Sequence, residues 1–116
     1  MDDRLKNALD FSNYRQTLAV QRKSLKEKIQ AKLTYGFNGG IFKIDQTLLS
    51  FVSILCSEGR TQGVVLLDTN ENPILIENLE MFKTEIFDRF FSVAFEYQEE
   101  YDKIKKSRSV EKLVDL

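Results

Sequence analysis

Two apolar stretches separated by a polar turn decide the fold: Val64-Val65-Leu66-Leu67, then Asp68-Thr69-Asn70-Glu71-Asn72, then Pro73-Ile74-Leu75-Ile76. A continuous apolar run of this length is typical of a strand that is covered on both faces. A proline can open the second strand because its missing N–H is tolerated at that position. Two strands joined by five turn residues predict an antiparallel hairpin.

The segments on either side of this hairpin predict helices. Residues 3–33 contain neither glycine nor proline and are rich in residues that favour helix. The poor helix formers Asp10 and Ser12 leave open a break in this first helix. Asp45 can cap a short helix that ends near Gly59, and Asn78 can cap a long helix over residues 79–107.

The region between the first two helices predicts one further strand. Gly36, Gly39 and Gly40 stop the first helix, and Ile41-Phe42-Lys43-Ile44 has the pattern of a short strand. The expected fold is therefore α+β in the order α-β-α-β-β-α, with a small three-stranded sheet and two long terminal helices. The helix-containing connection before Val64 suits a crossover, so we expect a parallel pair within that sheet.

The whole chain is predicted to be a single domain, residues 1–116. Its 116 residues, 42% of them hydrophobic, suit one core. Within this domain we expect four parts: a long N-terminal helix over 3–33, a β-α-β-β core over 34–78, a long C-terminal helix over 79–107 and a tail over 108–116.

The composition removes several classes of functional site. The absence of His excludes the Ser-His-Asp triad and zinc sites that need imidazole, and a single Cys cannot form an internal disulfide. A net charge of −1 provides no general basic field, so nucleic acid is not an expected partner. We expect no catalytic residue, no cofactor and no metal site, and therefore a protein that is not an enzyme.

The expected compartment is intracellular. Nothing near Met1 resembles a signal peptide, and no run approaches the roughly 20 apolar residues that span a bilayer. The single unpaired Cys56 fits a reducing environment. We therefore expect no membrane partner.

One short motif suggests calcium. Asp68-x-Asn70-x-Asn72 matches the opening of an EF-hand loop. Pro73 stands where that loop needs glycine, and Leu79 stands where it needs a bidentate glutamate. A hairpin turn is therefore the favoured interpretation.

The two long helices are expected to pack on each other, on a partner, or both. A helix of about 28 residues spans roughly 42 Å, whereas a five-residue strand spans roughly 17 Å, so the small sheet cannot cover both helices. Residues 15–32 are mainly basic and residues 77–102 mainly acidic. Complementary charge favours self-association through these helices, and two solvated faces are the alternative. The interface candidates are Phe11, Leu18, Leu25, Phe82, Phe90, Tyr97 and Tyr101.

Phe82, Ile86 and Phe90 recur every four residues and so share one face of the last helix. We predict that they join this helix to the core. A helical interface and a ligand cavity remain open as alternatives for the aromatic face as a whole.

Four segments together carry a resemblance to a known family: Phe11-Ser12-Asn13-Tyr14-Arg15-Gln16-Thr17, Asn38-Gly39-Gly40-Ile41-Phe42, Leu67-Asp68-x-Asn70-x-Asn72-Pro73-Ile74, and Tyr101-x-Lys103-x-Lys105-Lys106-Ser107-Arg108-Ser109-Val110-Glu111-Lys112-Leu113-Val114. In these segments the chain resembles the small prohead core proteins of T4-like tailed bacteriophages and cyanophages. No functional residue carries over from that family.

The resemblance implies a minor component of the internal scaffold that helps to build the phage prohead. Its expected partners are further copies of itself and capsid or scaffold proteins, in the host cytoplasm or the prohead interior. The competing hypothesis is a small intracellular adaptor or ligand-sensing α/β regulatory domain.

Overall fold

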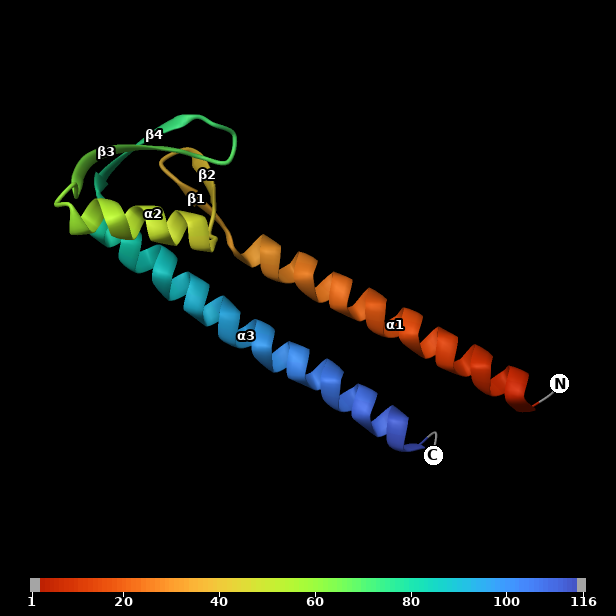
Figure 1. Cartoon of the computed structure of the whole chain (residues 1–116). Helices are drawn as coiled ribbons and strands as arrows, with labels where there is room; N and C mark the ends of the chain where they lie inside the picture. Colours follow the sequence, from red (N-terminus) through yellow and green to blue (C-terminus); the bar gives the residue numbers. More distant parts are fainter. Residues whose placement is uncertain (1–2, 115–116) are drawn as a thin grey trace. The chain divides into compact units, whose positions relative to one another are not determined.

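The computed structural model describes the backbone of residues 3–114 and the side chains of residues 3–106. The elements are α1 (Asp3–Lys32), β1 (Thr34–Phe37), β2 (Gly40–Lys43), α2 (Gln46–Ser57), β3 (Gln62–Leu67), β4 (Pro73–Asn78) and α3 (Leu79–Val114) (Figure 1). Within this described part, no helix is long and apolar enough to cross a membrane.

The chain divides into two compact units. The mixed unit, residues 30–95, holds all the strands, α2 and the first half of α3. The two-helix unit combines residues 1–29 with residues 96–116, and so contains most of α1 and the rest of α3. The single-domain organisation stays a prediction.

The α+β class is confirmed, but the predicted three-stranded sheet is wrong. The strands form two separate antiparallel hairpins, β1–β2 and β3–β4, so the expected parallel pair is also wrong. The strand predicted at 41–44 pairs with the segment just before it, and Tyr35 lies opposite Phe42. A tight turn at Asn38 and Gly39, both with positive φ, makes this local pairing possible.

The helix boundaries follow the predicted capping residues. The Asp45 side chain accepts a hydrogen bond from the backbone N–H of Leu48 at 2.8 Å, and the Asn78 side chain accepts one from Met81 at 3.1 Å. Such bonds satisfy N–H groups that have no partner within the helix. Gly59, with φ of 78°, follows the end of α2 and allows the left-handed turn there.

The long helices differ slightly from the prediction. The helix α1 is continuous through Asp10 and Ser12, so no break occurs there. The helix α3 continues beyond the predicted end at 107 and through most of the predicted tail, to Val114. Residues 115 and 116 of that tail lie outside the described residues.

The core of the mixed unit lies between the hairpins, α2 and α3. In Figure 1 both hairpins lie on the same side of α2. Phe82 is 1% exposed, and its ring lies 5.3 Å from the rings of Phe37 and Phe42. Ile86 is fully buried and Phe90 packs against the core while partly buried, which confirms that this face anchors α3. The core residues are Phe42, Ile44, Leu49, Val52, Leu66, Ile74, Ile76, Leu79, Phe82 and Ile86.

The prediction that strand 64–67 is covered on both faces is wrong. Leu66 is buried, but Val65 and Leu67 are 58% and 64% exposed. On β4 the same alternation buries Ile74 and exposes Leu75. The reason is that the core lies against only one face of this hairpin, so every second apolar residue faces away from it.

The two hairpins make close contact at Gly40. A Cβ atom added there would come within 2.6 Å of Ile74 Cγ1, which is closer than real Cβ contacts allow. Nearby, Asn38 Nδ2 donates a hydrogen bond of 2.9 Å to the carbonyl oxygen of Leu75. Glycine at position 40 is therefore what lets β2 approach β4 closely.

We expect Phe82→Ala to lower the free energy of unfolding by about 3–5 kcal/mol, because it removes a buried ring that contacts two other rings. Phe95→Ala is the matched control, since Phe95 lies on the same helix and is 70% exposed. Urea denaturation followed by circular dichroism measures both. Equal midpoints for the two variants would contradict the core assignment.

Candidate interaction surfaces

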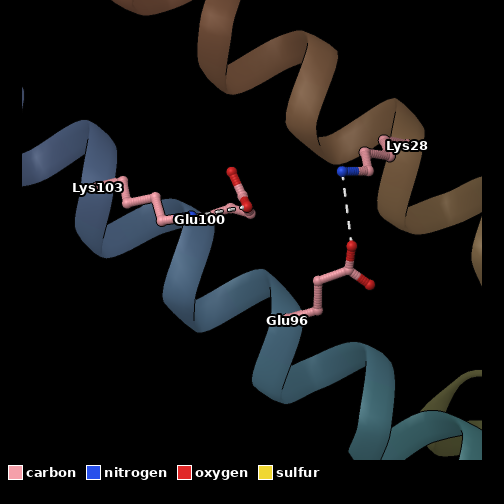
Figure 2. Close-up of polar contacts among 4 residues, drawn as sticks. All are labelled: Lys28, Glu96, Glu100 and Lys103. Carbon is pink, nitrogen blue, oxygen red and sulfur yellow. Dashed lines mark hydrogen bonds and ion pairs between the residues drawn. The ribbon is translucent and has the colours of Figure 1, made fainter.

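In the two-helix unit, α1 and α3 run antiparallel. Lys28 Nζ lies 3.5 Å from the Glu96 carboxylate, and on α3 itself Lys103 Nζ lies 3.3 Å from Glu100 (Figure 2). The first contact is an ion pair of the predicted kind between the basic and acidic segments. Exposed pairs of this type contribute about 0–1 kcal/mol, so they favour a particular alignment of the helices more than they stabilise it.

A groove of about 480 Å³ runs between these helices. Val20, in its wall, is 63% exposed, whereas Leu25 beside it is 8% exposed. The antiparallel pair therefore buries one part of the apolar surface and leaves another part open. The lining residues are Val20, Gln21, Ser24, Leu25, Lys28, Glu100, Lys103 and Ile104.

The predicted interface candidates fall in both units. In the two-helix unit Leu18 and Leu25 are buried, and Phe11 is 54% exposed with the Arg15 guanidinium 5.8 Å above its ring. Tyr97 and Tyr101, partly buried, have ring centres 6.3 Å apart.

The other two candidates, Phe82 and Phe90, lie in the mixed unit. Because Phe82 belongs to the core, it has no surface left for a partner. An interface role for the other candidates stays a prediction.

Sequence reasoning missed several exposed apolar side chains. On α1, Leu5 and Leu9 are about half exposed, and on α3 Phe91 is 54% exposed. On the hairpin β3–β4, Val65 and Leu75 lie opposite each other and are both exposed. The sequence alone could not reveal this outer face, because the exposure of every second strand residue depends on how many elements cover the hairpin.

Tyr35 links the first hairpin to α3. Its hydroxyl donates a hydrogen bond to a Glu85 carboxylate oxygen, and the Arg89 guanidinium lies 4.9 Å from the centre of its ring. Burial, together with the adjacent Glu85 carboxylate, raises the pKa of the Tyr35 phenol. The phenol is therefore kept neutral and can donate this hydrogen bond, which attaches β1 to α3.

Asp68 forms the turn of the second hairpin and also binds the first. One carboxylate oxygen accepts from the Ile41 N–H at 3.0 Å, and the other accepts from Asn70 and Asn72 at 3.0 and 2.8 Å. The backbone N–H of Thr69 donates to the Ile41 carbonyl at 2.8 Å. The hairpin turn predicted at 68–72 is therefore confirmed.

These hydrogen bonds decide what the Asp68 carboxylate can do. The N–H of Ile41 first, and then those of Asn72 and Asn70, lower its pKa, because they stabilise the charged form. Its oxygens are occupied by backbone donors rather than directed at a cation. Elsewhere in the described residues, no group of three or more His, Cys, Asp or Glu side chains gathers as metal ligands would.

Comparisons with protein-family models, with curated proteins and with solved structures find no match to this chain.

We expect Asp68→Asn to lower the melting temperature at pH 7. The amide NH₂ would replace one carboxylate oxygen, and an NH₂ group cannot accept the hydrogen bonds that the backbone N–H groups donate to that oxygen. The folded-state pKa of Asp68 lies below its usual value near 4. The stabilisation is therefore complete above pH 4 and is lost as the pH falls through the folded-state pKa. The difference between wild type and variant should shrink over that range.

Thermal unfolding between pH 7 and pH 2 measures this effect. Glu71→Gln is the control, since it removes a neighbouring charge from the same turn without touching the link to Ile41. A variant as stable as wild type at pH 7 would rule out the proposed role of Asp68.

Proposed function

We propose that this chain is a non-enzymatic assembly protein that associates with further copies of itself through the two-helix unit. The observation that carries the proposal is the exposed apolar surface of α1. Single exposed apolar residues are ordinary, but several on one side of a helix favour a partner. The residues on this side of α1 are Leu5, Leu9 and Val20, which are 46–63% exposed.

The arrangement of these residues around α1 supports a second partner for this helix. At about 100° per residue, Leu5, Leu9 and Val20 fall within about 60° of one another. The buried residues Leu18 and Leu25 fall on the roughly opposite side. Leu5, Leu9 and Val20 thus form an outer stripe that the packing within the unit leaves exposed, and Val20, at the edge of this stripe, also lines the groove between α1 and α3.

A second copy of the chain fits the outer stripe by charge. On α1 the exposed Lys23 lies on the same side of the helix as this stripe and the exposed Lys26 lies beside it, whereas the exposed Glu99 lies on the acidic segment of α3. When two copies pack their helices together, the basic α1 of one can face the acidic α3 of the other. Both copies then gain the same contacts, as in a two-fold symmetric dimer.

The finer proposal is a component of a phage prohead core, as the family resemblance implies. Its capsid or scaffold partners would be recovered when the tagged protein is isolated from its native source. Recovery of signalling or metabolic proteins instead would favour the alternative, a small intracellular adaptor or ligand-sensing domain.

We expect light scattering at micromolar concentration to report at least a dimer. Val20→Glu should lower the average mass in solution, because it places a charge in the outer stripe and so weakens the helical interface. Val20→Leu is the matched control and should keep the wild-type mass, since it preserves apolar surface. Because Val20 is exposed, both variants should remain folded. A wild-type protein that is monomeric at high concentration would overturn the proposal.

A further inference from the structure

The outer edge of β3 has no strand partner. The backbone N–H of Asp68 donates to the Asn72 carbonyl, and Leu66 lies opposite Ile74 in the same register. In an antiparallel pair only alternate residues bond across the ladder, so the N–H and C=O of Val65 and Leu67 face away from β4. Among the described residues, no other element supplies a backbone hydrogen bond to these groups.

This edge lacks the features that usually prevent pairing. Edge strands are commonly protected by charged side chains, proline or a covering element. The six residues of β3 include neither a charge nor a proline, and Val65 and Leu67 are exposed. The edge therefore presents free hydrogen-bonding groups together with apolar side chains.

The space beside the edge is open. A groove of about 510 Å³ lies there, with Phe51 and Leu55 of α2 as one wall. The other wall consists of residues 59–65, which are the connection from α2 and the first four residues of β3. The groove therefore borders the first part of β3, and an added strand would begin or end there.

Two unpaired charges at opposite ends of β3 indicate which strand fits. Arg60 precedes the strand and Glu71 follows it in the turn, and both are exposed. Within the described residues neither side chain forms an ion pair or a side-chain hydrogen bond. When β3 pairs antiparallel with itself, the start of one strand meets the end of the other. Each Arg60 then lies near Glu71 of the second copy, whereas a parallel pair would bring like charges together.

We propose that β3 pairs antiparallel with β3 of a second copy, to give a continuous four-stranded sheet with two Arg60–Glu71 ion pairs. This interface stands independently of the helical one. Only its consequence rests on the proposed function: a chain with two different two-fold interfaces assembles beyond a dimer.

The test exchanges the charges. Arg60→Glu puts two acids together at each end of the paired strands, and Glu71→Arg puts two bases together. Each variant alone should associate roughly tenfold more weakly than wild type. An equimolar mixture should associate as tightly as wild type, because in the mixed dimer every contact is again between opposite charges.

Sedimentation equilibrium at low salt measures these affinities, since salt screens exposed charges. All chains carry Val20→Glu, which separates the strand interface from the helical one. If Val20→Glu leaves the mass unchanged, the helical proposal fails, while the comparison of single variants with their mixture still tests the strand interface.

Glu77→Arg is the matched control, because it makes the same charge change on β4 and should leave association unchanged in every mixture. If the wild-type affinity returns only in the mixture of Arg60→Glu and Glu71→Arg, the result supports the antiparallel pair. Wild-type affinity in each single variant overturns it. Monomers throughout also overturn it, and would leave the groove beside β3 to an extended peptide from another protein.

Discussion

The mixed unit depends on one buried carboxylate. Asp68 is 6% exposed and accepts backbone hydrogen bonds from its own turn and from β2. An ionised group can be buried only where such donors replace water, so these N–H groups and the carboxylate require each other. Without it, the N–H of Ile41 on β2 would have no acceptor, and the Thr69 N–H to Ile41 carbonyl bond would be the one backbone–backbone hydrogen bond left between the two hairpins among the described residues. The glycine at position 40 complements this link by allowing the close approach to Ile74.

Much of the fold could be predicted from local residues because the relevant physics is local. Asp45, Asn78 and Gly59 mark helix ends through hydrogen bonds and backbone angles that involve only their neighbours in the chain. The hairpin β3–β4 could be predicted from an apolar run, a polar turn and a proline. These signals needed no knowledge of the rest of the molecule.

The errors arose where an outcome depends on distant contacts. The strand β1 has a glycine at position 36, which weakens the strand pattern, so the sequence does not indicate the partner of β2. The exposure of Val65 depends on how many layers cover the hairpin. Likewise, the position of Arg60 and Glu71 relative to β3 depends on where that strand begins and ends. The exposure of Val20 depends on which side of α1 is buried. The residues on which the two proposed interfaces depend therefore give no local signal in the sequence.

The two proposed association surfaces differ in their physical basis. The stripe on α1 would act through apolar burial, which tolerates sliding and rotation between helices. The edge of β3 would act through backbone hydrogen bonds, which require a defined direction and register. If both surfaces act as proposed, the directional contact at β3 would limit the geometries that the contact at α1 allows.

Both sheets in this protein join strands that follow each other directly along the chain. Contacts between near neighbours in sequence lower the entropic cost of loop closure, and proteins rich in them fold fast. In a newly made chain, β4 lies only a short turn away from β3, whereas another molecule must arrive by diffusion. The inner edge of β3 therefore pairs with β4 before a strand of another molecule can reach it. Rapid folding of this kind would protect β3 from aggregation through its inner edge, while its outer edge remains unpaired.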